Sequence, residues 1–444
     1  MSVPVITHSD LDGELTALGS APHWYVGFSG GVDSTALLHL LSRWRRANPG
    51  APPLTAIHIN HGMQSAADDW QVHCEWVCKM LQVPLISHQV SVLNSGRGDE
   101  ADAREARYRV FEQQLGDAEI LFLGHHLDDQ VETFFLRLLR GAGVQGLAAM
   151  PARRALGRGE LLRPLLAFTR EQVEQYIREQ GLSCIEDPSN SDTAMDRNFL
   201  RAELLPLLAS RWPGYRRTVA RAGGHMSATA EVLAELLPLP ETVYSAMGDP
   251  GVLQQSLAGK SGAQQLRSWL QAAGLPTPDQ AALEEFMRQL RESGADSAPR
   301  LQCSAYCLQR YRDAIYLLPD EVGLNLAAFQ LRPGDIFQVP GVGRLALEPT
   351  REAGVFLEPD ELLHLGWREG GERCSPVGRG GSNSLKKLLQ ERDVPPWWRA
   401  RIPLLYLGEE LLCVGDLWLC RSSRYRDFAP RGDSLWRLVW QRSA

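Results

Sequence analysis

The sequence predicts an α/β protein whose N-terminal part is built on a parallel sheet, and three observations support this. Short apolar runs alternate with amphipathic helical stretches through the first half of the chain, which is the pattern of βαβ units. A glycine-rich turn, Ser29–Thr35, lies between an apolar run and a helix. Polar motifs follow the apolar runs, at the strand ends where open α/β sheets bind ligands. We therefore expect one ligand site at the carboxyl edge of this sheet.

The elements of the first half follow in order from these runs. We expect strands at Tyr25–Phe28, Leu54–Ile59, Leu85–Val90 and Ile120–Gly124, because each run is short, apolar and bounded by turn residues. Each strand is followed by a stretch with apolar residues at helical spacing. The expected helices are Ser34–Arg46, Ala66–Gln82, Asp99–Leu115 and Asp128–Arg140.

The rest of the chain has a different pattern. Residues 215–295 show helical periodicity without strand signals, so we expect a mainly helical region there. Strand-like pieces return at Arg300–Leu308 and Asp313–Leu318, and further strands are expected near Leu404–Leu407, Leu411–Val414 and Leu435–Trp440. We expect three domains: a Rossmann-like parallel-sheet domain at 1–212, a mainly helical middle domain at 213–325 and a small mixed α/β domain at 326–444.

Composition narrows the class of protein. Of the 444 residues, 44% are hydrophobic and 22% charged, which is ordinary for a globular protein. The N-terminus is acidic and no apolar run is long, so we expect neither a signal peptide nor a membrane span. The eight cysteines form no CxxC pair, which favours reduced thiols in the cytoplasm. The net charge of −7 gives no overall argument for nucleic acid binding, although arginines cluster locally.

The turn Ser29-Gly30-Gly31-Val32-Asp33-Ser34-Thr35 has the features of a phosphate-binding loop. Its two glycines let the backbone approach an anion closely. The free N–H groups and the dipole of the helix that follows favour negative charge. The turn is not a Walker A loop, which would carry a lysine. A glycine-rich hairpin capped by a hydroxyl is the structural alternative, and the strand before the turn and the helix after it argue against that reading.

A second motif, Gly124–Thr133, places two histidines and three carboxylates directly after a strand. Asp128 is positioned to cap the helix that follows, and this is its structural explanation. His125 and Asp129 are four residues apart, so one helical turn could bring them onto the same face. Capping does not require so many titratable groups, so we expect catalysis or substrate binding here.

Two further stretches carry arginines at helical spacing. In Glu100–Tyr108, Glu100 and Arg104 form an i,i+4 pair that is unremarkable as a structural feature. After the loop Glu186–Asn190, Arg197 and Arg201 lie one helical turn apart, a spacing that suits phosphate contacts.

Taken in order, these motifs resemble those of the bacterial tRNA(Ile)-lysidine synthetases, a family of PP-loop ATP pyrophosphatases. The turn is similar to the PP-loop signature S-G-G-x-D-S, and it is followed by E-x-x-A-R-x-x-R-Y, H-H-x-D-D-Q-x-E-T and D-R-N-F-x-R elements. The stretches Leu385–Leu389 and Val394–Leu405 also look like the last domain of that family. The resemblance covers nearly the whole chain and is thin between about residues 230 and 360.

The resemblance implies an activity and its partners. ATP would adenylate the C2 oxygen of the wobble cytidine in tRNA(Ile) with a CAU anticodon, releasing pyrophosphate. Free L-lysine would then attack C2 through its ε-amine and displace AMP, which gives lysidine. The resemblance thus implies ATP and Mg²⁺ as cofactors, tRNA(Ile) and lysine as partners, and no membrane. The oligomeric state stays open, with a homodimer as one of the alternatives.

Roles for single residues also come from the resemblance. The PP-loop residues would cradle pyrophosphate, with Asp33 as the metal partner and with His58 and His61 beside the nucleotide. His125, with Asp129 nearby, would position or deprotonate the lysine amine, and Asp129 or Glu132 would recognise an ammonium group. The set expected at the catalytic centre is Asp33, His125, Asp129, Arg104, Arg107 and Arg201; at the nucleotide, Ser29, Gly30, Gly31, Val32, Asp33, Ser34, Thr35, His58 and His61; and at lysine or tRNA, Glu132, Arg197, Asn198, Lys386, Lys387, Arg399 and Arg401.

In the C-terminal set the basic residues lie on both sides of Trp397 and Trp398, which suits RNA phosphates and bases. We interpret the two tryptophans as core residues and the basic side chains as RNA contacts. Two other functions stay open. A tRNA thiolase on the same nucleotide fold would need a cysteine pair or a sulfur carrier, and a non-catalytic RNA-binding or nucleotide-sensing protein would not need the intact acid cluster.

Overall fold

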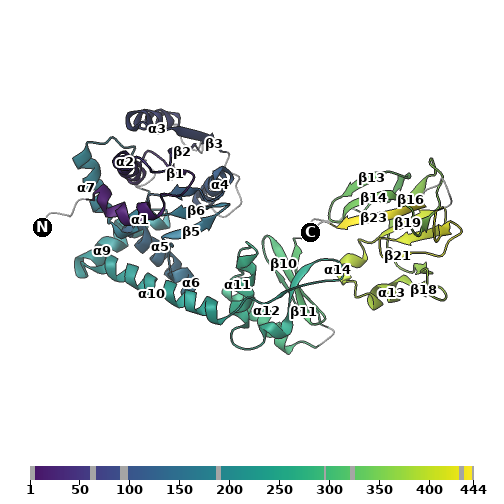
Figure 1. Ribbon diagram of the computed structural model, residues 1–444. Coiled ribbons are helices and arrows are strands. Elements are labelled where there is room, and N and C mark those ends of the chain that lie inside the picture. Colours follow the sequence, from purple (N-terminus) through teal and green to yellow (C-terminus); the bar gives the residue numbers. More distant parts are fainter. Residues whose placement is uncertain are drawn as a thin grey trace. The chain divides into compact units, whose positions relative to one another are not determined.

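The computed structural model describes residues 6–60, 67–90, 99–186, 192–294, 297–320, 326–429 and 435–442. The chain divides into two compact units, Met1–Leu236 and Leu237–Ala444, which are described separately below (Figure 1). The three-domain division with boundaries at 212/213 and 325/326 stays a prediction. No helix within the described ranges combines the length and the apolar character that a membrane span requires.

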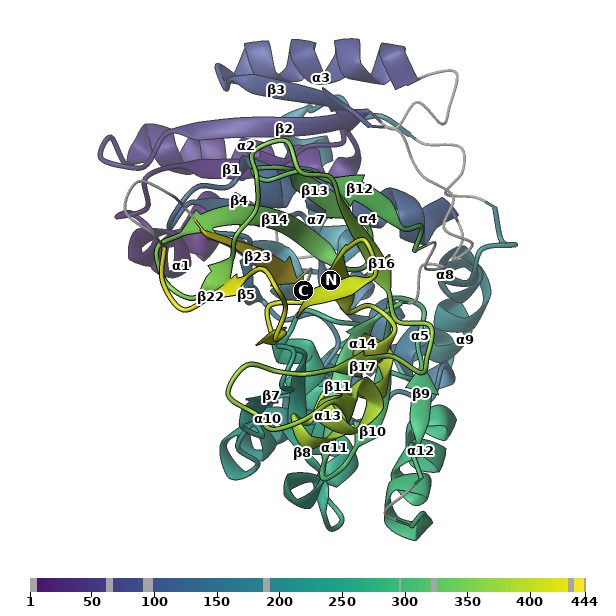
Figure 2. The ribbon, with the colours of Figure 1, turned by 90° about the vertical axis from the view of Figure 1, so that its right-hand side faces the viewer.

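The first unit contains a six-stranded sheet with the order β3-β2-β1-β4-β6-β5. Figure 2 shows β3, β2, β1 and β4 following one another in this order. All neighbours are parallel except the β5–β6 hairpin, and Trp24 is in register with Leu54 on one side and Ile120 on the other. The strands are β1 (Trp24–Gly27), β2 (Leu54–Asn60), β3 (Leu85–Gln89), β4 (Ile120–Phe122), β5 (Arg153–Leu156) and β6 (Gly159–Leu162).

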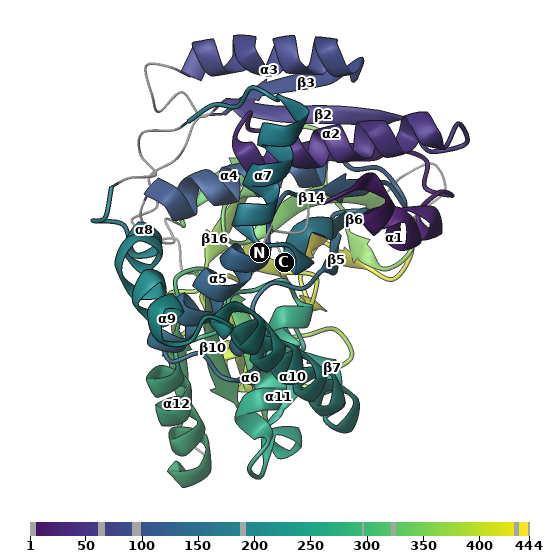
Figure 3. The same ribbon diagram turned by 90° about the vertical axis from the view of Figure 1, so that its left-hand side faces the viewer.

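Helices connect these strands and cover the sheet. On one face α2 (Val32–Ala47) packs beside α7 (Arg170–Gln180), as Figure 3 shows. The buried face of α2 and the indole rings of Trp24 and Trp44 belong to the main apolar core. The other elements that carry or flank the sheet are η1 (His8–Leu11), α1 (Asp12–Ala17), α3 (Ala67–Leu81), α4 (Asp99–Gln114), α5 (Leu127–Leu139), α6 (Val144–Leu147) and η2 (Pro164–Ala167).

The predicted elements of this half are confirmed to within two residues at each end. The β5–β6 hairpin was not predicted, because its outer strand begins with Arg153 and Arg154 and lacks an apolar run. The unit ends with α8 (Asp196–Phe199), a π-helical turn η4 (Leu200–Leu204), α9 (Leu205–Arg211) and the long helix α10 (Tyr215–Leu236).

The second unit begins with a five-stranded antiparallel sheet, ordered β7-β8-β11-β10-β9, against which two helices pack. The helices α11 (Gly262–Ala272) and α12 (Gln280–Glu292) confirm the predicted helical periodicity. The range 215–295 is mainly helical as expected, but it also contains β7 and β8, which were not predicted because they are too short to show alternation. The strands are β7 (Thr242–Tyr244), β8 (Pro250–Leu253), β9 (Arg300–Gln302), β10 (Tyr306–Tyr311) and β11 (Ala314–Pro319), with a short 3-10 helix η5 (Gln254–Leu257) after β8.

The rest of the second unit contains two five-stranded sheets and two short helices, α13 (Leu385–Glu391) and α14 (Pro396–Arg399). One sheet has the order β12-β16-β19-β20-β21 and the other β13-β14-β23-β15-β22. The three strands expected here are confirmed as β19 (Pro403–Leu407), β20 (Glu410–Val414) and β23 (Leu435–Arg442). The remaining strands are β12 (Phe329–Leu331), β13 (Ile336–Val339), β14 (Gly343–Thr350), β15 (Gly354–Val355), β16 (Leu363–Trp367), β17 (Arg373–Cys374), β18 (Asn383–Ser384), β21 (Trp418–Leu419) and β22 (Tyr425–Arg426).

The two tryptophans of α14 are tied into the second unit by one carboxylate. Trp398 Nε1 donates to Asp249 Oδ1 at 2.8 Å and to Oδ2 at 2.9 Å, and Trp397 Nε1 donates to Oδ2 at 3.1 Å. Asp249 is buried and also accepts from the Ser245 hydroxyl. The interpretation as a core residue is confirmed for Trp398, which is buried, and Trp397 packs partly buried against the same core.

Candidate functional site

The glycine-rich turn joins β1 to α2 and depends on Gly30 having no side chain. Gly30 has a φ of +81°, and a Cβ there would lie 2.4 Å from Ile185 Cδ1. Its carbonyl accepts the Ile185 backbone N–H at 2.9 Å, so the turn is also held from the opposite side. Gly31 is the N-cap of α2, which leaves the first N–H groups of a 16-residue helix at the mouth of the loop.

Hydroxyl groups brace the inside of this loop. The Ser29 N–H donates to Ser34 Oγ at 3.2 Å, and Ser34 Oγ donates to the Gly31 carbonyl at 3.1 Å. Thr35 is buried and its hydroxyl donates to the Gly30 carbonyl at 3.2 Å. Of the predicted loop residues, Thr35 therefore shapes the loop from behind, and Ser29 and Ser34 hold its two ends together.

His58 is also behind the loop. It belongs to β2, is buried, and shares a hydrogen bond of 3.0 Å between its Nδ1 and the Phe28 carbonyl. Burial lowers the pKa of its imidazole. A neutral ring donating to that carbonyl supports the strand that enters the loop. His61 lies outside the described residues.

The carboxyl end of β4 meets the start of α2 at Gly124. A Cβ on Gly124 would lie 2.8 Å from the Asp33 carbonyl oxygen, so only glycine allows this approach. The chain then turns into α5, with His126 as the N-cap. The polar segments that follow β1 and β4, which the sequence predicted to form one site, therefore lie next to each other.

His126, rather than His125, joins the acids of the two motifs. Its Nδ1 accepts the Asp129 backbone N–H at 3.3 Å, and Asp129 Oδ2 accepts the His126 backbone N–H at 3.0 Å, which forms a capping box. Its Nε2 lies 3.6 Å from Asp33 Oδ1 and 3.4 Å from Asp129 Oδ2. The sequence did not single out His126, because two adjacent histidines give no signal as to which one turns inward.

Among the described residues, the buried Oδ1 of Asp33 has no hydrogen-bond partner, and neither has His126 Nε2, which lies 3.6 Å from it. Burial raises the pKa of the Asp33 carboxyl, His126 lowers it and Asp129 raises it. A buried oxygen left unpaired is costly unless a ligand satisfies it, so this atom points to a bound cation or polar ligand.

The next turn of α5 carries Glu132, which is fully buried and held by two arginines. Arg201 donates from Nε to Glu132 Oε1 at 2.8 Å and from Nη2 to Oε2 at 2.9 Å, and Arg197 Nε lies 3.5 Å from Oε2. Arg201 Nη2 also approaches Asp129 Oδ1 at 3.8 Å. Burial raises the pKa of Glu132, and the charges of Arg201 and Arg197 oppose that rise.

Arg201 lies within the π-helical turn η4, and such turns frequently occur at functional sites. The predicted residues Asp129, Glu132, Arg197 and Arg201 are thus close to one another. Asn198 is buried nearby and donates from its amide to the Asp192 carbonyl at 2.9 Å, so its side chain supports the loop before α8.

Asp128 lies in the first turn of α5, where its charge favours the helix start as expected, and it has a further structural role. It does not cap its own helix: its Oδ2 accepts the Arg170 backbone N–H at 2.9 Å at the start of α7, and its Oδ1 pairs with Arg216 of α10. The capping position of α5 is taken by His126. Asp128 therefore ties three helices together beside the site.

A cavity of about 350 Å³ lies beside Glu132 and Arg201. Carboxylates and arginines line it, together with apolar side chains at its back. The lining residues are Asp128, Glu132, Thr169, Arg170, Glu171, Glu174, Arg201, Leu205, Pro206, Tyr215 and Arg216.

His125 has a different environment from His126. Arg163, which directly follows β6, donates from Nε to His125 Nδ1 at 3.2 Å. Arg163 Nη2 also donates to the Tyr108 hydroxyl at 3.4 Å, and the guanidinium of Arg104 lies 5.0 Å from the centre of the Tyr108 ring. The predicted residues Arg104 and Arg107 are exposed on α4. Arg163 was not predicted as a site residue, because it belongs to no recognisable motif. It lies at this edge of the sheet because β6 pairs with β4.

The predicted basic residues of the second unit differ in their exposure and in the contacts that their side chains make within the protein. Lys386 and Lys387 are exposed on α13, with Lys387 Nζ 3.9 Å from Glu391. Arg399 donates to the Val394 carbonyl at 3.0 Å and to the Tyr311 hydroxyl at 3.4 Å, so it has a structural role. The guanidinium of Arg401 lies 5.6 Å from the centre of the Trp398 ring.

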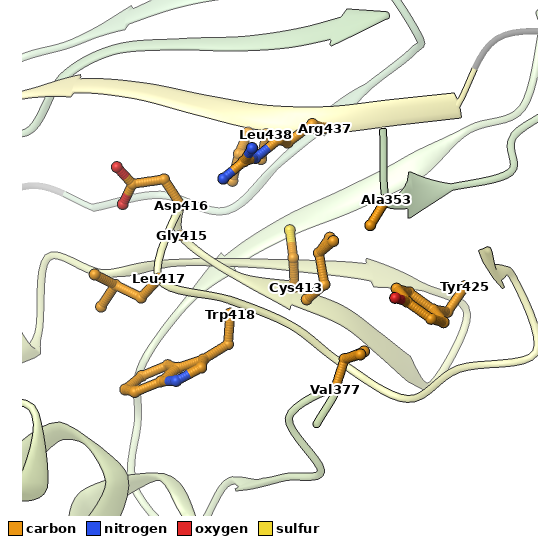
Figure 4. Close-up of a pocket in the computed structure, with 11 residues that line it drawn as sticks. Ala353, Val377, Cys413, Gly415, Asp416, Leu417, Trp418, Tyr425, Arg437 and Leu438 are labelled. Carbon is orange, nitrogen blue, oxygen red and sulfur yellow. The ribbon is translucent and has the colours of Figure 1, made fainter. Parts of the chain in front are cut away.

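The second unit also has a cavity of about 250 Å³ between strands of its C-terminal part (Figure 4). Figure 4 shows Cys413, Tyr425 and Trp418 among the side chains that line it. Asp416, at its rim, is already paired with Arg442 at 2.6 Å. None of the predicted site residues lines this cavity.

The loop, the parallel sheet and the position of the acid cluster define a PP-loop nucleotide-binding protein. The family model described as the PP-loop domain matches residues 10–208. Two further models match the second unit: the TilS substrate binding domain at residues 263–316 and the TilS substrate C-terminal domain at residues 363–440.

Curated relatives extend this similarity to nearly the full chain. The tRNA(Ile)-lysidine synthase of Pseudomonas syringae pv. tomato is 42% identical over 432 residues, which cover 93% of this chain and 94% of that relative. The protein of the same name from Pseudomonas aeruginosa is 40% identical and covers 94% of this chain and 93% of that relative. That of Serratia proteamaculans is 37% identical and covers 96% and 97%. The chain belongs to the tRNA(Ile)-lysidine synthase family.

Proposed function

We propose that this protein forms lysidine in tRNA(Ile) by joining free L-lysine to C2 of the wobble cytidine at the expense of ATP. The single observation that carries this proposal is that a phosphate loop, the buried Oδ1 of Asp33 beside His126 and a Glu132–Arg201 pair meet at one sheet edge. The membership of the family supports the same reaction, with AMP and pyrophosphate as the other products.

The PP-loop is our candidate for holding the leaving pyrophosphate of ATP. The N–H groups at the start of α2 and the backbone of Gly30 and Gly31 offer donors and no side-chain obstruction. Asp33 Oδ1, which is buried and has no hydrogen bond from the described residues, suits a hard cation with oxygen ligands. Mg²⁺ bound there would neutralise phosphate charge.

Lysine is proposed to bind in the cavity beside Glu132 and Arg201. A zwitterionic amino acid needs cationic donors for its carboxylate and carboxylates for its ammonium groups, and both line this cavity. Asp129 does not line the cavity, but its Oδ1 lies 3.8 Å from Nη2 of Arg201, which does. Burial by itself would raise the pKa of Asp129, but His126, through its charge and its backbone N–H hydrogen bond, and Arg197 act against that effect, and the net pKa is lowered, so Asp129 stays ionised.

The nucleophile sets a physical demand on this site. The pKa of a lysine ε-amine is about 10.4, so roughly one molecule in a thousand is neutral near pH 7, and deprotonation costs about 4 kcal/mol. Desolvation lowers the pKa of an amine, and a carboxylate that accepts its proton can reduce the cost further. The acceptor we propose is the ionised Asp129, which lies beside His126 next to the loop.

For tRNA, we propose that Lys386 and Lys387 contact phosphates. They are exposed on the short helix α13. This helix lies within residues 363–440, which match the TilS substrate C-terminal domain. Lysines on a surface bind phosphates mainly as point charges.

Pyrophosphate release tests the proposal before any product is identified. We expect release from ATP only when a tRNA(Ile) transcript with a CAU anticodon is present, and a fall of about 100-fold or more in Asp33→Asn. A tRNA(Met) transcript with the same anticodon serves as the matched control. Release without any tRNA, or none with either transcript, would contradict the proposed adenylation.

A further inference from the structure

We propose that Arg163 is a positioning residue that fixes His125 as a neutral imidazole with its proton on Nε2. His125 then acts as a hydrogen-bond donor to an oxygen of the substrate rather than as a base. The inference rests on the proposed function for the identity of the reaction. The protonation state and tautomer of the His125 ring, by contrast, follow from the contacts of Arg163.

Arg163 is itself held in one position. It is only 3% exposed, and Nη1 donates to the Pro151 carbonyl at 2.7 Å while Nη2 donates to the Tyr108 hydroxyl at 3.4 Å. Its backbone N–H donates to the Ala152 carbonyl at 2.9 Å. With both terminal nitrogens engaged, Nε is directed at His125 Nδ1 at 3.2 Å.

This contact determines which ring nitrogen carries the proton. A guanidinium is a donor only and does not lose its proton in proteins, so His125 Nδ1 must be the acceptor. A neutral imidazole with an acceptor at Nδ1 has its hydrogen on Nε2. Protonating Nδ1 would place two N–H groups and two positive charges against each other.

The surroundings of His125 act in the same direction. Burial lowers the pKa of its imidazole, Asp129 of α5 raises it, and Arg163, Arg104 of α4 and Arg197 of α8 lower it, with a lowered pKa as the net result. The ring is thus neutral throughout the physiological range. A neutral histidine with so low a pKa is a weak base for an amine, whereas its Nε2–H is a good donor to an oxygen that gains negative charge.

His125 is also in the right place for such a donor. It follows β4 and is partly exposed, and the described part of the chain offers Nε2 no hydrogen-bond acceptor. The acceptor we assign to it is an oxygen of the reacting nucleotide or cytosine. Of the two roles expected for His125, positioning or deprotonating the lysine amine, this assignment omits deprotonation and gives the ring a role in binding and charge stabilisation.

Two substitutions at His125 separate the roles. Gln keeps an N–H donor but is no base, so His125→Gln should retain activity within about 10-fold of the wild type, while His125→Ala should lose about 100-fold or more. Equal loss in both variants, with unchanged thermal unfolding, would overturn the donor role. The pH–rate profile of His125→Gln should match that of the wild type.

The ring state can be measured without activity. In the full-length protein with ¹⁵N-labelled histidine, His125 should give the shifts of a neutral Nε2–H tautomer from pH 5 to 8, with His125→Gln assigning its signals. In Arg163→Met the ring should titrate nearer its ordinary pKa of about 6.5, and Arg163→Lys should partly restore the neutral state. Arg154→Met is the matched control, because Arg154 stacks on Tyr108 at 5.1 Å and has no contact with His125 among its described interactions.

A titrating or Nδ1–H ring in the wild type would overturn the inference. This readout does not depend on lysine transfer. A protein that fails to make lysidine but shows the Nε2–H tautomer would contradict the proposed function and leave the assignment of Arg163 intact.

Discussion

The Glu132 carboxylate is fully buried and is held by the Arg201 guanidinium through two parallel hydrogen bonds of 2.8 and 2.9 Å. Arg201 itself is 30% exposed, so the pair has one buried and one accessible member. Bidentate pairing of this kind fixes geometry as well as charge. The accessible edge of Arg201 faces the same cavity that we propose for lysine.

Glu132→Ala should destabilise the fold, because it leaves Arg201 and Arg197 without their buried counter-charge. We expect a loss of about 3 kcal/mol in the free energy of unfolding, measured by urea denaturation. Glu160→Ala, which breaks the exposed pair with Arg153, is the control and should cost less than about 1 kcal/mol. Equal losses in the free energy of unfolding for the two substitutions would show that the burial of Glu132 does not add to the cost of removing it.

Gly30→Ala should disable the loop, because the φ of +81° and the 2.4 Å approach to Ile185 both exclude a Cβ. The left-handed conformation alone costs roughly 1–2 kcal/mol for an L-residue. We expect ATP affinity, measured by calorimetry, to fall at least 10-fold. Gly50→Ala has open space around the added methyl group and should leave affinity unchanged. Normal ATP binding by Gly30→Ala would rule out the described loop conformation.

Stability should depend on pH through His39, whose Nδ1 lies 2.8 Å from the Tyr176 hydroxyl between α2 and α7. Burial and the charges of Arg43 and Arg46 lower the pKa of His39 to about 4. Between pH 6.5 and 4 the unfolded chain takes up the proton first, so stability falls as the pH falls through this window. In His39→Gln the loss of stability between pH 7 and pH 5, measured by urea unfolding, should be smaller than in the wild type. An equal loss in both proteins would exclude His39 as a contributor.

The double variant Lys386→Ala with Lys387→Ala should bind tRNA more weakly while ATP affinity stays near normal. If both lysines neutralise phosphates, the slope of log affinity against log salt should decrease by about 1–2. Filter binding over a salt series measures this, with exposed Lys79 of α3 as the control substitution. Unchanged tRNA affinity would remove α13 from the proposed interface.

Much of the first unit could be predicted because its signals are local. The apolar runs of β1, β2 and β4 and the periodicity of α2 arise from burial on a single sheet, so each element shows its pattern in its own residues. The short strands β7 and β8 carry no such pattern, since three or four residues cannot show alternation and their pairing with β11 supplies the burial.

The candidate site could be located from the sequence but not resolved into contacts. The choice between His125 and His126 depends on how the backbone turns after β4, and the capping box that sets this turn involves both main chain and side chain. Arg163 reaches His125 only because β6 lies next to β4 in the sheet. Likewise, nothing in the sequence pairs Asp249 with the tryptophans of α14, which are far away along the chain.

The most direct test of the central claim uses labelled lysine, ATP, Mg²⁺ and an unmodified tRNA(Ile) transcript with a CAU anticodon. The tRNA is treated with alkali after the reaction, which removes lysine esterified to the terminal ribose. We predict that label stays on the tRNA, because lysine is bonded to the base. Pyrophosphate release without alkali-stable label would contradict lysine as the nucleophile, and the absence of both signals would contradict the proposed enzyme activity altogether.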